Sequence, residues 1–260
     1  MDFIYNFWEN QAAKYGVSHE ASWGDVYAID LEISNIASHI SEGKSVLDVG
    51  CANGFALIKH AKNFKLAQSV GIDFSPKMIE MANESLAKEN NNYNYNIQFK
   101  TGDIRGLDFP DNSFDIVYTT RVLINLPNWQ EQIKGISECI RVAKPGGTII
   151  FSEAFWEPLV KLNALRSVFG LKALTEHDFN RYLKKSNLNE YLNAQNIVFE
   201  TSDFSSIYYL GSRLIRDLIP ESKTFVGYDN PVNKIFYNIE KDFSGGDVGI
   251  QQAYILKKPF

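Results

Sequence analysis

The sequence predicts an α/β domain built around a mostly parallel β-sheet. Strand-like and helix-like runs alternate from residue 26 to about residue 152, an order typical of parallel sheets covered by helices on both faces. After residue 152 this alternation stops, and the last two strand-like runs are expected to complete the sheet as an antiparallel pair. The chain has 260 residues, of which 45% are hydrophobic, and this is enough for one domain with a full core.

The predicted strands are seven short runs rich in β-branched and aromatic residues, which favour strands. In chain order they cover residues 46–49, 68–73, 97–103, 114–120, 148–153, 196–200 and 251–258. Apolar residues recur at helical spacing from Val26 to Ile40, and Ser75 followed by Pro76 is a strong helix start. Further helices are expected at residues 55–62, 75–89, 129–140, 157–192 (as three short helices), 205–219 and 230–243.

The whole chain, residues 1–260, is expected to form a single domain with a cap. Residues 41–156 are the predicted core. The aromatic-rich residues 1–40 and two helical insertions, 157–195 and 203–247, are expected to form the cap. The asparagine-rich stretch 83–96 is expected to be a polar loop that closes a helix.

Charge and composition exclude several classes of function. The formal net charge is −5, so the surface should not attract nucleic acid or anionic membranes without specific contacts. Cys51 and Cys139 show neither a pairing pattern nor metal-ligand spacing, and we expect no metal. The N-terminus lacks the positive charge of a signal peptide, and no apolar run has the length of a membrane span. We therefore expect a cytoplasmic protein.

The stretch "VLDVGCANGFA", residues 46–56, carries an aspartate and a glycine-rich turn at the end of a strand. In such sheets this turn binds nucleotide-like ligands, because glycine lets the backbone approach the ligand. The spacing is D-x-G-x-x-x-G, formed by Asp48, Gly50 and Gly54. A dinucleotide-binding G-x-G-x-x-G is excluded because Ala52 and Phe55 replace its other glycines, and no lysine–serine pair follows as in a P-loop.

Two further acids end the next two strands. Asp73 lies where a ribose-binding carboxylate is expected, and a carboxylate can accept hydrogen bonds from both ribose hydroxyls. Asp103 could accept a hydrogen bond from an adenine amino group. Asp48 suits a positive centre and would repel phosphate. The three acids therefore predict a pocket for an adenosine that carries a cation.

At this point the chain resembles the class I S-adenosylmethionine (SAM)-dependent methyltransferases of the small-molecule type. The resemblance covers roughly residues 40–155 and rests on five motifs in the family's order: "VLDVGCANG", "VGIDFSPKMIEMA", "GDI", "FDIVYTTRVLINLPN" and "ECIRVAKPGGTIIFSE". It implies a Rossmann-like, seven-stranded sheet, SAM as cofactor and S-adenosyl-L-homocysteine as product. It also implies a small-molecule substrate. Together with the charge, it leads us to expect no nucleic acid or membrane as partner, and a monomer or homodimer.

The resemblance further implies which residues contact the cofactor. The glycine turn would wrap the methionine part of SAM, and Asp73 would hold the ribose. The end of the third predicted strand would border the adenine, and the end of the fourth would border the methionine part and the opening for the substrate. The alternative role for Asp48 is to orient backbone amides, and the alternative place for Met78 is the core. The implied cofactor-binding residues are Asp48, Gly50, Cys51, Ala52, Asn53, Gly54, Asp73, Phe74, Met78, Gly102, Asp103, Ile104, Thr119 and Arg121.

One departure from the family pattern concerns the proton acceptor. Many small-molecule members carry a His-His pair after the fourth strand, where this chain has Ile124 and Asn125. Asn125 is expected either to orient a substrate or to cap the next helix. If a base is used, His19, close to Trp23, is the first candidate and His177 the second; a surface role for His19 is the alternative.

Tyrosine, arginine and tryptophan side chains of the cap are the expected substrate contacts. They are Trp23, Arg166, Tyr182, Tyr209 and Arg213, and they suit a small polar acceptor that is anionic, phosphorylated or sugar-like. Tyr209 and Arg213 are four residues apart and would share a helix face. Arg213 binds either the acceptor's charge or a surface carboxylate such as Glu221. The expected reaction is methyl transfer to oxygen or nitrogen by in-line displacement. The alternatives are a methyltransferase for protein or RNA and a catalytically silent cofactor-binding partner.

Overall fold

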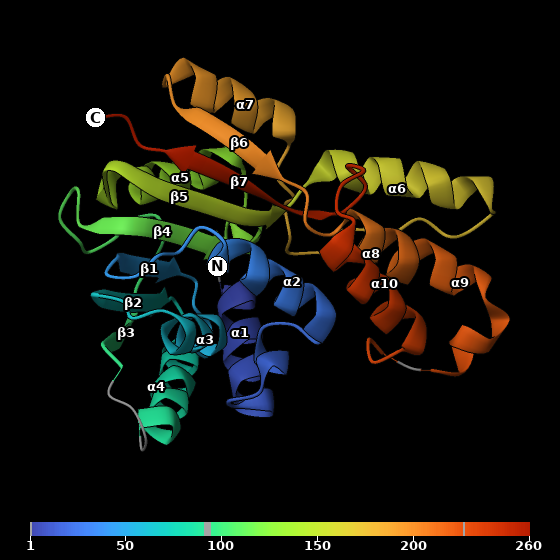
Figure 1. The fold of residues 1–260 in the computed structure, drawn as a ribbon, viewed down its shortest axis with the longest axis horizontal. Helices are drawn as coiled ribbons and strands as arrows, with labels where there is room; N and C mark the ends of the chain where they lie inside the picture. Colours follow the sequence, from blue (N-terminus) through green and yellow to red (C-terminus); the bar gives the residue numbers. More distant parts are fainter. Residues whose placement is uncertain (1, 91–94, 226) are drawn as a thin grey trace.

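The computed structural model, which describes residues 2–90, 95–225 and 227–260, contains the predicted seven-stranded sheet (Figure 1). The strand order is β3-β2-β1-β4-β5-β7-β6, and β7 runs antiparallel to both of its neighbours, which confirms the predicted fold class. The strands are β1 (Ser45–Val49), β2 (Gln68–Asp73), β3 (Ile97–Thr101), β4 (Phe114–Thr120), β5 (Ala143–Ala154), β6 (Val198–Ser202) and β7 (Gln251–Lys257).

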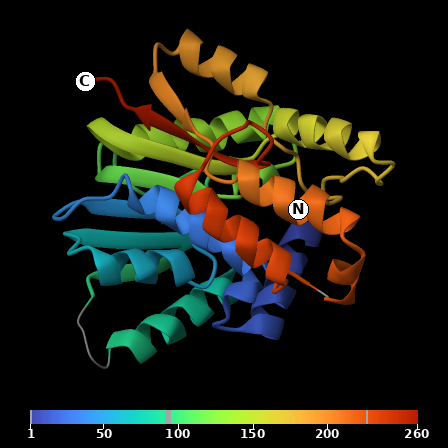
Figure 2. The same ribbon diagram turned by 45° about the vertical axis from the view of Figure 1, so that its right-hand side comes forward.

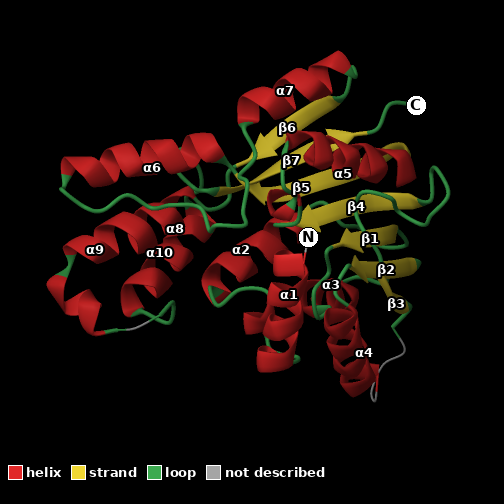
Figure 3. Ribbon diagram, turned by 180° about the vertical axis from the view of Figure 1, so that it is seen from behind, coloured by secondary structure: helices red, strands yellow, loops and turns green. Residues whose placement is uncertain are grey.

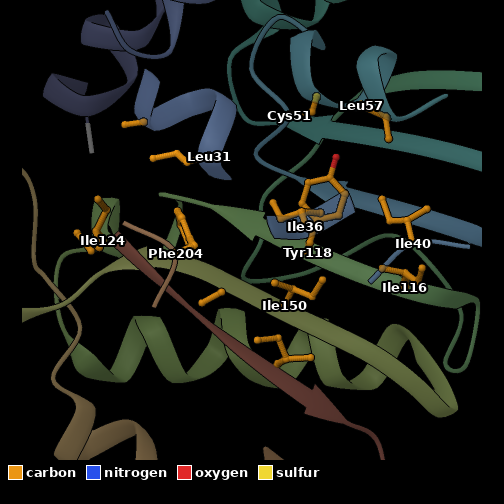
Figure 4. Close-up of a cluster of buried hydrophobic side chains, with 14 of the residues drawn as sticks. Leu31, Ile36, Ile40, Cys51, Leu57, Ile116, Tyr118, Ile124, Ile150 and Phe204 are labelled. Carbon is orange, nitrogen blue, oxygen red and sulfur yellow. The ribbon is translucent and has the colours of Figure 1, made fainter. Parts of the chain in front are cut away.

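Helices cover both faces of the sheet, as Figure 3 shows from behind. On one face lie α2 (Val26–Ala37), α3 (Phe55–Asn63) and α4 (Pro76–Asn90), and on the other lie α5 (Trp129–Val142) and α7 (Lys185–Ala194). Residues of β1 alternate between the two cores, with Val46 in the first and Leu47 in the second. Figure 4 shows the first core, where Ile36 of α2 lies beside Tyr118 of β4.

The remaining helices gather beyond one end of the strands (Figures 1 and 2). They are α1 (Asp2–Tyr15), α6 (Trp156–Val168), α8 (Ser206–Leu210), α9 (Arg216–Leu218) and α10 (Pro231–Asp242), with a π-helical turn at Gly211–Ile215 and short 3₁₀ helices at His19–Ala21, Leu123–Asn125 and Pro220–Thr224. The π turn comes close to α10, because a Cβ atom on Gly211 would lie 1.9 Å from the Phe236 ring. Glycine is therefore required there.

Two local predictions need correction. Residues 157–192 do not form three helices: α6 ends at Val168, and residues 169–184 carry no helix. The segment instead turns back along α6, where Asn163 exchanges two hydrogen bonds with the backbone of Leu174. In the asparagine-rich stretch 83–96, α4 continues to Asn90, and residues 91–94 lie outside the described residues. The predicted helix start holds, because Ser75 Oγ accepts from the Met78 amide at 3.0 Å.

None of the helices in the described part of the chain combines the length and the apolar character that crossing a membrane requires.

Candidate active site

A cavity of about 880 Å³ lies where β1, β2, β4 and β5 end at their carboxyl ends. Its floor is formed by the loops that follow these strands, and its roof by α1 and by the cap residues around α8. In parallel α/β sheets this edge is the usual place for a ligand. The volume is near the upper end of the range of about 300–1,000 Å³ for small-molecule sites, which leaves room for two ligands.

The glycine turn after β1 is held against the end of β2. The amides of Gly50 and Cys51 both donate to the Ile72 carbonyl, at 2.7 and 2.9 Å. Gly50 has a φ of +80°, and a Cβ atom there would lie 2.1 Å from a methyl group of Val122. Only glycine therefore allows the loop after β4 to come this close to the turn.

Asp73 ends β2 with a buried carboxylate that faces the cavity. One oxygen accepts from the Ala52 amide at 3.0 Å and the other from the Ser75 amide at 2.9 Å. Burial raises the pKa of Asp73 to about 6, although these amides oppose the shift. Each oxygen keeps a lone pair, so the carboxylate can still accept from the two hydroxyls of a ribose.

Asp48 and Glu32 add two more buried carboxylates to the cavity wall. Burial, together with the neighbouring carboxylates of Asp73 and Glu32, raises the pKa of Asp48 to about 8, although the Tyr118 hydroxyl opposes the shift. Glu32 is paired with a cation, Arg121, whose Nε lies 3.5 Å from Glu32 Oε2. Buried carboxyl groups with raised pKa values fit a ligand that brings a positive centre, because its charge would stabilise their ionised forms.

Asp103 also lies on the wall, together with Gly102 and Ile104. Its carboxylate accepts from the amide and the guanidinium of Arg105, and these bonds lower the pKa of Asp103. Arg105 also reaches Glu131 at 3.2 Å. The side chain of Asp103 is 44% exposed, so the predicted contact with adenine would have to share this carboxylate with Arg105.

The loop after β4 is organised by Glu153, a fully buried residue of β5. Its carboxylate accepts from Thr119 Oγ1 at 2.7 Å and from the amides of Val122, Leu123 and Ile124 at 3.0, 3.1 and 3.3 Å. Burial raises the pKa of Glu153 to about 7, although these donors oppose the shift. The four bonds fix the turn that carries Arg121 and Asn125.

Arg121 and Asn125 face the cavity from this turn. Arg121 has a φ of +55°, and its guanidinium lies over the Trp23 ring at 4.6 Å. Asn125 donates from Nδ2 to the Arg121 carbonyl at 2.7 Å, while its buried Oδ1 has no partner among the described residues. The alternative that Asn125 caps the next helix is wrong, because Asn128 caps α5. Its free oxygen is suited to a ligand.

Arg213 enters the cavity from the π turn. One of its terminal nitrogens, NH2, donates to Asp25 at 2.6 Å, and its guanidinium lies over the rings of Tyr209 and Tyr228 at 5.3 and 5.1 Å. Asp25, the buried N-cap of α2, also accepts from the Tyr208 hydroxyl at 2.5 Å. Arg213 therefore pairs with Asp25 and not with Glu221.

The N-terminal helix closes the cavity over the cofactor side. Glu9 of α1 accepts from Ser75 Oγ at 2.6 Å and from the Lys77 amide at 3.1 Å. Asn53 donates to the carbonyls of Gly16 and Ser18, which follow α1, at 3.0 and 2.7 Å. The side chain of Asn53 therefore ties down the N-terminal segment.

Sixteen of the predicted site residues are on the cavity wall: Trp23, Asp48, Gly50, Cys51, Ala52, Asn53, Asp73, Phe74, Gly102, Asp103, Ile104, Arg121, Asn125, Tyr182, Tyr209 and Arg213. His177, the second candidate base, is there too. The strand-end acids and the glycine turn had identified some of them, and the resemblance to the methyltransferases most of the others. Glu32 and Glu153 were missed, although an acid inside an apolar helical stripe or at the end of a buried strand is a usable signal.

Five predicted residues do not line the cavity among the residues that the structure describes: His19, Gly54, Met78, Thr119 and Arg166. Each has a structural reason. The His19 ring packs beside Phe55, and a Cβ on Gly54 would meet Phe99. Met78 belongs to a small core under α1, and Thr119 donates to Glu153.

Arg166 needs a separate correction, because it was expected to converge on the acceptor. It is buried in the cap, where it donates to the carbonyls of Lys172 and Arg213 and pairs with Asp217 at 2.8 Å. All of these partners are parts of the cap. Arg166 therefore joins α6 to the π turn and α9.

Comparison with known proteins agrees with this geometry. The methyltransferase-domain family matches residues 40–196. A ubiquinone biosynthesis O-methyltransferase of Coxiella burnetii is 31% identical over 174 residues, which cover 65% of this chain and 68% of that protein. The chain belongs to the class I SAM-dependent methyltransferases.

One further relative and one solved structure are similar to this chain over different shares of their length. An uncharacterized methyltransferase of Schizosaccharomyces pombe is 34% identical over 119 residues, 45% of this chain but only 42% of that protein. The putative methyltransferase solved in complex with the Trm112 activator of Haloferax volcanii is 17% identical, with a TM-score of 0.64 over 99% of this chain and 98% of that one. The latter similarity concerns the fold.

The residues of this methyltransferase fit SAM. When bound, SAM supplies an activated methyl group on a positively charged sulfur. The buried carboxylates of Asp48 and Glu32 complement that charge, and Asp73 has free lone pairs for the ribose. Among the described residues no group of three or more His, Cys, Asp and Glu side chains could hold a metal ion.

Proposed function

We propose that the methyltransferase transfers the methyl group of SAM to an oxygen or nitrogen atom of a small, polar acceptor that carries an anionic group. The acceptor would lie between the sheet and the cap, with its anionic group on Arg213. The anion can be a carboxylate or a phosphate, because a guanidinium binds both in the same forked geometry.

The orientation of Arg213 carries this proposal. Asp25 engages one of its terminal nitrogens, and the two tyrosine rings hold the plane of the guanidinium. Although burial works against the charge, Asp25 and the neighbouring tyrosines raise the pKa of Arg213, so it stays protonated. No other hydrogen bond runs from this guanidinium to the described residues, so its remaining N–H groups are free for a ligand.

Other groups on the wall suit a polar acceptor. Asn125 Oδ1 is a buried acceptor without a partner in the described part of the chain, and the Tyr182 hydroxyl is near Arg213. The roof formed by α1 and the cap encloses the cavity, which favours a small molecule over a macromolecule. These features support the proposal independently of Arg213.

The test uses SAM labelled in its methyl group and fractions of a small-molecule metabolite extract. We expect one fraction to become labelled by the wild-type protein. With that fraction, Arg213→Lys should raise the KM for the acceptor about tenfold, since lysine keeps the charge but loses the forked geometry. The cofactor affinity, measured by calorimetry, should not change. Arg216→Lys, a matched change outside the cavity wall, should behave like the wild type.

Two results would contradict the proposal. Label that enters protein or RNA but no small-molecule fraction would contradict a small acceptor. An unchanged KM for the acceptor in Arg213→Lys would contradict the binding of its anionic group by Arg213. A loss of SAM affinity in the same variant would place Arg213 on the cofactor instead.

A further inference from the structure

We infer that Glu32 is the general base of the reaction, the group that takes the proton from the acceptor atom as this atom is methylated. The inference rests on the proposed function. No sequence motif pointed to Glu32, and His19, the histidine first considered for this role, is not on the cavity wall. Glu32 comes from the middle of α2 and is only 1% exposed.

The two oxygens of Glu32 have different surroundings. Oε1 accepts from Ser152 Oγ at 2.7 Å and from Gln251 Nε2 at 3.2 Å. Oε2 accepts no hydrogen bond from the described residues, and its contact among them is the ion pair with Arg121 Nε at 3.5 Å. The carboxylate is therefore anchored through Oε1, and Oε2 is the oxygen of this wall residue that is left to accept a proton.

Glu32 lies between the cofactor side and the acceptor side of the cavity. Its charge raises the pKa of Asp48, below the glycine turn, and also that of Tyr209, beside Arg213. Arg121, on the turn after β4, is the third charged or titratable group that faces it. The hydrogen bonds to Ser152 and Gln251 and the ion pair with Arg121 place Glu32 where β5, β7 and the turn after β4 meet at the cavity, and we take this to be near the point of methyl transfer.

Asp73, Asp103 and His177, three other titratable groups on the wall, are engaged elsewhere. Both oxygens of Asp73 accept backbone amides, and Asp103 is bound by Arg105. His177 stacks on Phe179, with the ring planes 12° apart, on the loop that follows α6. Asp48 is buried as well, but Glu32 is the wall carboxylate that has one oxygen anchored by two side-chain hydrogen bonds and a second oxygen without one among the described residues.

The proposed step is balanced in atoms and electrons. A lone pair of the acceptor atom attacks the methyl carbon, the carbon–sulfur bond breaks, and its electron pair stays on sulfur, which becomes neutral. The proton of the acceptor atom moves to Glu32 Oε2. Burial raises the pKa of Glu32, while Arg121, Ser152 and Gln251 oppose the shift. A carboxylate with a raised pKa is a stronger base near neutral pH.

Glu32→Gln tests the role, because glutamine keeps the shape and an oxygen for Ser152 but cannot take the proton. With the labelled fraction described above, we expect kcat to fall at least 100-fold. The KM for the acceptor and the affinity for S-adenosyl-L-homocysteine should stay within threefold. The control is Glu240→Gln, a buried glutamate of α10 that lies off the cavity wall and accepts from the Tyr208 amide at 2.7 Å; its kcat should not change. A kcat within threefold of the wild type, or a raised KM with unchanged kcat, would overturn the assignment.

A second measurement does not need the acceptor. Calorimetry at pH 7 in two buffers of different ionisation enthalpy gives the protons released when a ligand binds. SAM should release more protons than S-adenosyl-L-homocysteine, because its positive sulfur lowers the pKa of a nearby carboxyl. Glu32→Gln should at least halve this difference, and Glu240→Gln should preserve it. Equal differences in all three proteins would overturn the position of Glu32, whereas absence of methyl transfer by the wild type would contradict only the proposed function.

Discussion

The cofactor side and the acceptor side of the cavity are built in different ways. On the cofactor side, the turn at Gly50 and the end of β2 are joined by backbone hydrogen bonds, and Asp73 binds amides of the same two loops. On the acceptor side, Arg213 is held by Asp25, 188 residues away in the sequence. The first side depends on local backbone geometry, and the second on a buried pair of charges. Substitutions on the two sides should therefore have different consequences.

The largest effect is expected when the buried pair on the acceptor side is broken. Arg213→Ala leaves the Asp25 carboxylate buried without its cation, which should lower the free energy of unfolding by about 3–5 kcal/mol. Urea denaturation measures this loss. Arg216→Ala should cost less than about 0.5 kcal/mol, because that side chain lies at the surface. Equal stability of the two variants would show that the pair contributes little.

The next effect concerns Glu153, which supports both sides. Its pKa of about 7 in the folded protein is above the ordinary value of 4.5, so the unfolded chain loses the proton first as the pH rises. The stability of the wild type should therefore fall between pH 4.5 and 7, relative to Glu153→Gln, by about 3 kcal/mol. Unfolding of both proteins across this pH range measures the difference. A difference independent of pH would contradict the raised pKa.

A smaller effect is expected on the cofactor side. Asp73→Ala should weaken SAM binding by about 1.5–3 kcal/mol, or about 10- to 150-fold, since it removes hydrogen bonds from a charged group to the ribose. Calorimetry gives the affinity, and the exposed Asp108→Ala serves as control. An affinity that does not change in Asp73→Ala would remove the ribose assignment.

The smallest effect is expected at His19. Since this side chain packs beside Phe55 and does not line the cavity, His19→Asn should keep the wild-type rate within about twofold across the pH range. The measurement is a pH–rate profile with the labelled fraction. A shifted profile would restore His19 as a participant in proton transfer.

The same contrast explains how far the sequence could predict the structure. The sheet, its antiparallel end and the acids at the ends of β1 and β2 follow from periodicity and strand ends, which are local signals. Local signals could not identify the partner of Arg213, because the sequence pattern around Asp25 indicates only an ordinary helix cap. The partners of Arg166 are also invisible to local signals, so the sequence predicted that Arg166 binds a ligand. In the structure its guanidinium donates to groups of the cap.

Helix α2 also sets a length for the acceptor. Asp25, which positions Arg213, and Glu32, which we assign as the base, are seven residues apart on this helix. At 1.5 Å per residue and 3.6 residues per turn, they lie on the same face about 10 Å apart. If the acceptor binds with its anionic group on Arg213 and its reacting atom beside Glu32, as we propose, two turns of α2 separate the residues that position these two groups. We therefore expect acceptors with more than two or three bonds between the anionic group and the nucleophilic atom to be preferred, because α2 fixes the spacing of the two residues.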